Sequence, residues 1–167
     1  ALVYLDIDDV VDGSVVTANI SNITNLNLSV YGTITDLTGI EDFTSLQILR
    51  CDSQGLTTLD LSSNLMLTEL YCTRNFLTNL DVSSNTALTV LQCNSNLITS
   101  LDLSQNLALK DLECYDNQLT SIDVNGLVSL ETLIARWNWL SRLDISTNTA
   151  LRNLNCQNNQ LTCIQVN

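Results

Sequence analysis

Residues 67–87 have the sequence L-T-E-L-Y-C-T-R-N-F-L-T-N-L-D-V-S-S-N-T-A, and this 21-residue unit recurs along the chain. Five full units and a divergent sixth cover residues 46–163, with leucine columns at fixed offsets inside them. A period of roughly 20–50 residues indicates a repeat architecture, so this unit decides the fold. The period is clearest in one column, which holds Cys51, Cys72, Cys93, Cys114, Ala135 and Cys156.

The segment around Leu70 and Cys72 has the alternation of a short β-strand. Leu70 and Cys72 fall on one side of such a strand, and Glu69, Tyr71 and Thr73 on the other. Because each copy has an apolar side that it cannot bury alone, successive copies are expected to stack in parallel and in register.

The unit L-x-x-L-x-C-x-x-N-x-L resembles the L-x-x-L-x-L-x-x-N-x-L core of the leucine-rich repeat family. The resemblance implies an α/β-type leucine-rich repeat solenoid, mostly β with little helix, with right-handed coils of 21 residues and a parallel sheet on the concave face. It also implies that Asn75 and its equivalents bury their amides against backbone groups of adjacent coils. Residues 34–49 resemble the longer repeats of internalin-like proteins. The chain as a whole resembles secreted or cell-surface proteins of Bacteroidetes-type bacteria, which implies a secreted or cell-surface location.

We expect one domain over residues 1–167, in keeping with a chain of ordinary domain length. Residues 1–22 form an N-terminal cap, residues 23–163 about six to seven repeats, and residues 164–167 the start of an incomplete coil or cap. The last coil has no evident cap, so the chain is predicted to be a fragment of a longer protein. Cys163, in a surface column, would then lack its disulfide partner.

The other five cysteines are predicted to be reduced and buried. Side chains at one register position of a parallel sheet are parallel, which does not give the torsion near about 90° that a disulfide needs. Ala135 in the same column indicates that the position requires a small apolar group.

The composition excludes several classes of function. The chain has 18 acidic and 6 basic residues, and its net charge of −12 argues against a nucleic-acid or anionic-membrane partner. It has no His, which excludes Ser-His and Cys-His pairs and His-ligated zinc. No run of about 18 apolar residues is long enough to insert in a membrane, and we expect a monomer.

Two carboxylate features raise the question of calcium. Asp6, Asp8 and Asp12 suggest a calcium loop, but Val10 and Val11 stand where ligand 5 and the glycine of an EF-hand belong. Turn formation is therefore favoured there, and no other cofactor is predicted. A second column is expected either to accept backbone hydrogen bonds in its turns or to bind divalent cations in a row; it holds Asp60, Asp81, Asp102, Asp123 and Asp144.

The variable positions between the core columns are the candidates for ligand binding. Tyr, Trp and Arg carry much of the energy of protein interfaces, and both tryptophans fall in one coil. An alternative for Trp139 is that it packs along the edge of the solenoid. The candidate residues are Glu69, Tyr71, Asn94, Glu113, Tyr115, Arg136, Trp137 and Trp139.

We therefore predict a non-catalytic module that recognises a protein or glycan through the concave face. A structural spacer in a larger surface protein is the alternative. A carboxylate-based glycan hydrolase would pair Glu69 or Asp111 with Glu113, but an open sheet offers little burial to shift a pKa. We expect no enzyme.

Overall fold

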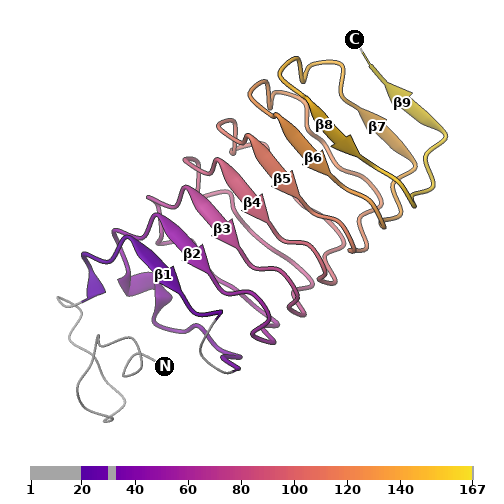
Figure 1. Cartoon of the computed structure of the whole chain (residues 1–167). Coiled ribbons are helices and arrows are strands. Elements are labelled where there is room, and N and C mark those ends of the chain that lie inside the picture. Colours follow the sequence, from indigo (N-terminus) through magenta and orange to yellow (C-terminus); the bar gives the residue numbers. More distant parts are fainter. Residues whose placement is uncertain (1–19, 30–32, 167) are drawn as a thin grey trace.

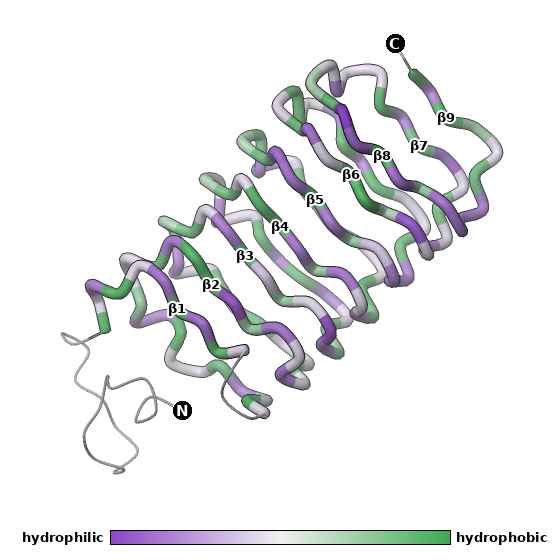
Figure 2. The backbone as a smooth tube through the Cα atoms, viewed as in Figure 1, coloured by the Kyte–Doolittle hydropathy of each residue, from purple (hydrophilic) through white to green (hydrophobic). Residues whose placement is uncertain are grey.

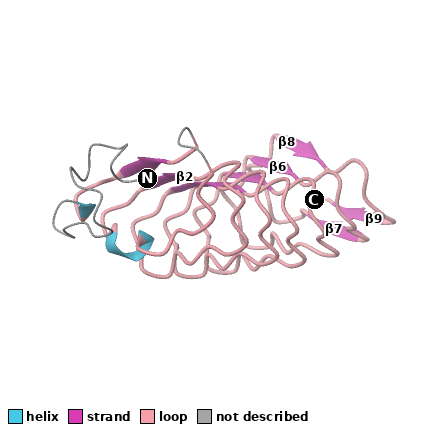
Figure 3. Ribbon diagram, turned by 90° about the horizontal axis from the view of Figure 1, so that it is seen from below, coloured by secondary structure: helices cyan, strands magenta, loops and turns pink. Residues whose placement is uncertain are grey.

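The computed structural model describes residues 20–29 and 33–166, which form a β-solenoid (Figure 1). Seven three-residue strands make one parallel sheet in the order β1-β2-β3-β4-β5-β6-β8. These strands are β1 (Asn25–Asn27), β2 (Ile48–Arg50), β3 (Glu69–Tyr71), β4 (Val90–Gln92), β5 (Asp111–Glu113), β6 (Thr132–Ile134) and β8 (Asn153–Asn155). The 3₁₀ helix η2 (Ile40–Asp42) precedes β2. Figure 3 shows strands β2, β6 and β8 on one long side of the array and turns on the other.

The sheet register follows the sequence period. Leu49, Leu70 and Leu91 are paired in turn, so each neighbour is 21 residues further on. The first pairing joins Leu26 to Leu49, because the first coil is longer by two residues. The parallel leucine-rich repeat solenoid that the sequence predicts is confirmed, and almost all of it is strand and turn.

The core is a stack of leucines inside the coils. From β2 to β6 each strand buries its central residue between two half-buried ones, which matches the alternation in the sequence. Figure 2 shows that apolar and polar segments recur from coil to coil. In the described part of the chain, no helix has the length and apolarity needed to cross a membrane.

One asparagine ladder closes the turns that follow the strands. The Asn96 amide donates to the carbonyls of Cys72 and Cys93, both at 3.0 Å, and its Oδ1 accepts the N–H of Leu77 at 3.0 Å. The amide thus links two coils and leaves none of these buried backbone groups unpaired. The buried amides implied by the family resemblance are present at Asn75, Asn96, Asn117 and Asn138, and half-buried at Asn159.

A second asparagine ladder, to which the sequence analysis gave no role, lies in the turns that precede the strands. Its members are Asn64, Asn85, Asn106 and Asn148. Asn106 donates to the carbonyls of Val82 and Asn85, both at 3.0 Å. Unlike Asn96, it has a buried Oδ1 without a hydrogen-bond partner. Leu127 fills the same column and is also buried, so this position accepts an apolar side chain.

The cysteine column lies in the core as free thiols. Cys51, Cys72, Cys93 and Cys114 are buried, as the sequence predicts, and burial raises the pKa of the Cys93 thiol to about 12. Neighbouring thiols therefore stay neutral at physiological pH. Cys156 departs from the prediction because it is only half-buried; it directly follows β8, the last strand of the sheet.

The aspartate column caps its turns. Asp102 Oδ1 accepts the backbone N–H of Ser104 at 2.9 Å, and this hydrogen bond lowers the pKa of the carboxyl group. At the other four members of the column, the aspartate Oδ1 likewise accepts the backbone N–H of the residue two positions later. The structure matches the turn-capping interpretation of this column.

A second sheet of two strands was not expected. It pairs β7 (Arg142–Asp144) with β9 (Cys163–Gln165), and β7 lies between β6 and β8 in the sequence. Leu143 is buried in it and Cys163 is exposed, in agreement with the surface position assigned to this cysteine.

Two predictions from the sequence fall wholly or mostly on residues outside the described part. The calcium candidates Asp6, Asp8 and Asp12 lie there, as does most of the cap assigned to residues 1–22. The domain boundaries stay a prediction.

The two asparagine ladders should differ in their tolerance of leucine. Asn96→Leu leaves the buried Leu77 N–H without an acceptor and should lower the free energy of unfolding by about 2–4 kcal/mol. Asn106→Leu removes an amide whose oxygen is already unpaired and should cost no more than about 1 kcal/mol. Denaturant unfolding of both variants measures the difference, and equal losses would contradict it.

Thiol labelling should separate the cysteines by burial. In the folded protein, 5,5′-dithiobis(2-nitrobenzoic acid) should modify Cys163 first and Cys156 more slowly, because these two are the accessible thiols. The four buried thiols should react only after unfolding. Fast reaction of more than two thiols in the native protein would contradict the buried ladder.

Candidate functional site

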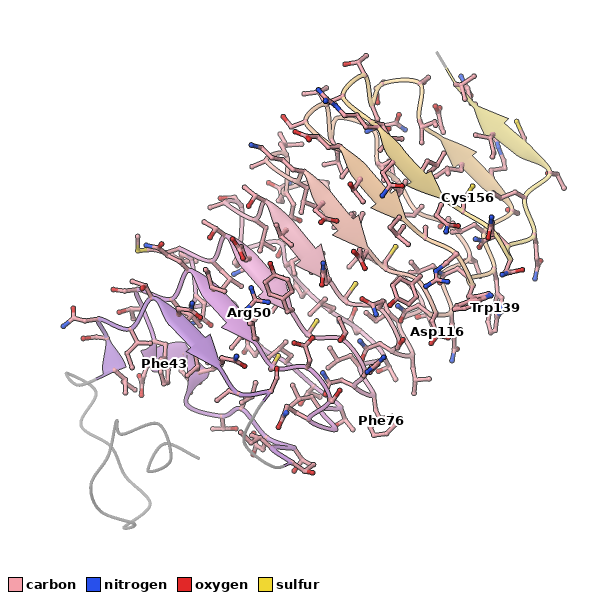
Figure 4. All side chains as sticks on the ribbon, in the orientation of Figure 1. Phe43, Arg50, Phe76, Asp116, Trp139 and Cys156 are labelled. Carbon is pink, nitrogen blue, oxygen red and sulfur yellow. The ribbon has the colours of Figure 1, made fainter. Side chains whose placement is uncertain are left out.

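The outward residues of the seven-stranded sheet form the surface that we call the sheet face. Its residues come from the two ends of each strand and the positions after it, and most are half-buried. In two groups on the sheet face an arginine contacts aromatic rings, one over β2 and β3 and the other beyond β5 and β6. Figure 4 shows Arg50 in the first group.

The first group consists of Arg50, Glu69 and Tyr71. The Cζ atom of Arg50 lies 3.7 Å from the centroid of the Tyr71 ring, and its Nη2 lies 3.8 Å from Glu69 Oε2. The Tyr71 hydroxyl donates to the same Glu69 oxygen at 2.9 Å. The candidates Glu69 and Tyr71 therefore already have partners, and the charge of Arg50 has its counter-ion within the group.

The second group consists of Tyr115, Arg136 and Trp137, and we call it the aromatic–arginine cluster. The Cζ atom of Arg136 lies 4.5 Å from the Tyr115 ring centroid and 4.3 Å from that of Trp137. Contacts of this kind between a guanidinium and a ring face contribute about 0.5–1 kcal/mol each at exposed sites. Trp137 is 47% exposed, so the cluster presents a large aromatic surface to solvent.

The backbone at Trp137 is in the left-handed region, with φ of 54°. The repeat imposes this conformation on the whole column, which holds Ser53, Arg74, Ser95, Asp116, Trp137 and Asn158. Short polar residues such as Asn and Asp tolerate the left-handed region, whereas a bulky side chain is an outlier there, at a cost of about 1 kcal/mol or more. The sequence predicts no core constraint on this column, and its lack of a repeated residue type gives no signal of the backbone constraint.

Two further candidates, Asn94 and Trp139, lie outside these two groups. Asn94 is only 4% exposed, so its side chain offers little surface to a ligand. Trp139 is 50% exposed and belongs to a column with the exposed Phe76 and Leu97. In Figure 4, Phe76, Asp116 and Trp139 lie along the same edge of the solenoid. The edge position proposed for Trp139 therefore agrees with the structure, but the side chain remains open to solvent.

Asp111 and Glu113 sit at the two ends of β5, and both are half-buried. Burial raises the pKa of each carboxyl group; for Glu113 the negative charge of Asp111 adds to the rise and Arg136 opposes it. An open sheet was expected to offer little burial; here it half-buries both carboxyl groups, which is enough to raise their pKa values. Gln92 donates from Nε2 to Glu113 Oε1 at 3.3 Å.

The hollows of the surface lie away from these carboxylates. One of about 760 Å³ lies over residues 36–84 and is lined by Asp60, Asp81 and the threonines beside them. Another, of about 160 Å³, lies among apolar residues between Ile20 and Phe43. Within residues 20–29 and 33–166, no group of three or more Asp, Glu or Cys side chains is placed to hold a metal ion.

Replacing Asp111 by Asn should stabilise the protein at neutral pH. The raised pKa means that the folded state binds a proton more readily, so the wild-type carboxylate destabilises the fold above its folded pKa. The gain in Tm should be full at pH 7 and shrink as the pH falls through the raised pKa toward the ordinary value of about 3.9. Asp102→Asn is the control, since its lowered pKa predicts no such gain. Thermal unfolding between pH 3 and pH 7 measures both.

No family model and no curated protein matches the chain, but solved structures do. The functional domain of InlJ from Listeria monocytogenes is 33% identical, with a TM-score of 0.59, over 90% of this chain and 43% of that one. An internalin (InlF) from the same species is 25% identical, with a TM-score of 0.72, over 89% and 46%. A leucine-rich repeat protein of Leptospira interrogans shares the fold at 24% identity, with a TM-score of 0.82, over 90% and 42%.

The chain therefore spans less than half the length of each of these three structures. The InlJ domain includes a cysteine ladder, and the buried column from Cys51 to Cys114 is a feature of the same kind. The repeat unit, the parallel sheet and these similarities lead to one assignment: the chain is an internalin-like leucine-rich repeat protein.

Proposed function

We propose that the chain is a non-catalytic recognition module that binds a protein or glycan ligand through the sheet face. The observation that carries the proposal is the aromatic–arginine cluster. Tyr, Trp and Arg are the residue types that most often carry interface energy, and here all three are in contact on an accessible surface.

The strained backbone at Trp137 supports the same conclusion. A residue that costs stability at its position is accounted for more readily by a role in binding than by a role in folding. Asn158, in the same column and with φ of 55°, has the residue type that the left-handed region tolerates. The fold would therefore accept Asn in place of Trp137, and the tryptophan adds exposed aromatic area.

The location that we propose is outside the producing cell or on its surface. The support for it is the resemblance of the repeat unit to those of secreted and surface leucine-rich repeat proteins. A recognition surface built from exposed aromatic side chains is suited to that location, where it meets foreign proteins and glycans.

Trp137→Asn should abolish ligand capture without lowering stability. Wild-type protein and the variant are applied to arrays of purified extracellular proteins and glycans, and Tm is measured in parallel. We expect capture by the wild type to be lost in the variant, because the aromatic surface is gone. The Tm should stay equal or rise, because Asn relieves the left-handed strain.

Two control variants locate the binding surface. Trp139→Gln places at the edge the residue type found at Gln118 and Gln160 and tests whether the edge contributes. Arg142→Gln changes an exposed arginine of β7, in the second sheet, and should leave capture unchanged. Equal capture by the wild type and Trp137→Asn, or none by either, would favour a structural spacer. Turnover of a captured glycan would contradict the non-catalytic part of the proposal.

A further inference from the structure

The two arginines that contact aromatic rings on the sheet face differ in one respect. Arg50 has a carboxylate beside it, with Nη2 at 3.8 Å from Glu69 Oε2. Within residues 20–29 and 33–166, Arg136 forms no such ion pair, and none of its guanidinium N–H groups donates a hydrogen bond to the protein. Arg136 is therefore a half-buried cation whose donors have no partner in the described chain.

The ring contacts hold Arg136 in a suitable state for binding an oxyanion. A guanidinium has five N–H donors in its plane, and contacts with the faces of rings leave those donors free. Because Tyr115 and Trp137 already restrict the side chain, less conformational entropy is lost when an anion binds. Two parallel N–H donors fit the two oxygens of a carboxylate.

The neighbouring charges discriminate between oxyanions. Burial and the charge of Asp111 raise the pKa of Glu113, and the positive charge of Arg136 opposes this rise, so Glu113 and Arg136 interact electrostatically. The backbone N–H of Asp116 donates to the Arg136 carbonyl at 3.0 Å, which places a second acidic residue beside Arg136. A phosphate group carries about −1.5 to −2 charges at pH 7 and would be repelled by these carboxylates more strongly than a singly charged carboxylate. The surroundings of Arg136 therefore favour a carboxylate ligand.

The edge beside the cluster favours a protein as the source of that carboxylate. Phe76, Leu97 and Trp139 are 59%, 40% and 50% exposed in one column along this edge. Aliphatic and aromatic side chains of a protein can cover such a row, whereas the hydroxyl groups of a sugar cannot pair with Leu97 or Phe76.

We propose that Arg136, held against Tyr115 and Trp137, binds an Asp or Glu side chain of a protein partner, whose neighbouring apolar residues cover the edge at Phe76, Leu97 and Trp139. This inference rests on the proposed recognition function and specifies the chemistry of its ligand. Arg50 does not bind the partner's carboxylate, because the Glu69 carboxylate already lies beside its guanidinium.

The test uses an immobilised array of peptides in which Glu or Asp is flanked by apolar residues, each paired with its Gln or Asn counterpart. The wild type should bind the acidic peptides about tenfold or more tightly than their amide partners, since a hydrogen-bonded charge contributes about 1.5–3 kcal/mol. Arg136→Gln should remove this preference, and Arg50→Gln should keep it. Thermal unfolding confirms that both variants fold.

Other outcomes would overturn the inference. They are equal binding of acidic and amide peptides by the wild type, an unchanged preference in Arg136→Gln, and no binding of any acidic peptide at millimolar concentration. Binding confined to glycans that carry uronic acids, added as a separate arm, would also overturn it. If Trp137→Asn loses ligand capture while Arg136→Gln retains it, recognition by the sheet face stands and only the carboxylate assignment fails.

Discussion

The whole array depends on the hydrogen bonds of one side-chain amide per coil. At the turn after each strand, backbone groups are buried where the chain itself offers no partner, and leaving them unpaired is costly. The amide at Asn96 donates to two coils and accepts from the earlier one. Aspartate lacks the donors and would bury a charge, whereas leucine lacks both donor and acceptor. Stacking of the leucines follows once this turn is closed.

Because the repeated columns stabilise the scaffold, the side chains of the sheet face are free to differ from coil to coil. Equivalent strands carry Arg50, which has an ion pair with Glu69, and Arg136, which has none in the described part of the chain. The strand geometry therefore does not determine whether the arginine is paired. What the repeat does impose is the left-handed backbone after β2, β3, β4, β5, β6 and β8. At Trp137 the bulky side chain conflicts with that backbone, which supports the proposal that this position serves binding rather than folding.

The sequence predicts the features that repeat, because the 21-residue period translates into register. The strands, the Cys51–Cys114 column and the aspartate caps such as Asp102 follow from it. Features that depend on the particular side chains of the adjacent coil do not follow from the period. The burial of Asn94 between its neighbours and the raised pKa of Asp111 are of this kind. The β7–β9 sheet also breaks the period, since it forms in two coils whose equivalents elsewhere have no strand at that position.

The carboxyl groups of the chain have different surroundings and different pKa shifts in the turns and on the sheet face. At Asp60, Asp81 and Asp102 the carboxylate is exposed and accepts a backbone N–H, which lowers its pKa, so the negative charge belongs to the turn. On the sheet face the carboxylates of Asp111 and Glu113 are half-buried, and their pKa values are raised. A net charge of −12 therefore does not describe the sheet face, where Arg136 provides a cation that has no ion pair among residues 20–29 and 33–166. On the acidic partner that we propose, long-range repulsion and short-range attraction would act together. Such a partner would approach slowly and bind only where its carboxylate meets Arg136, which would give selectivity at the expense of association rate.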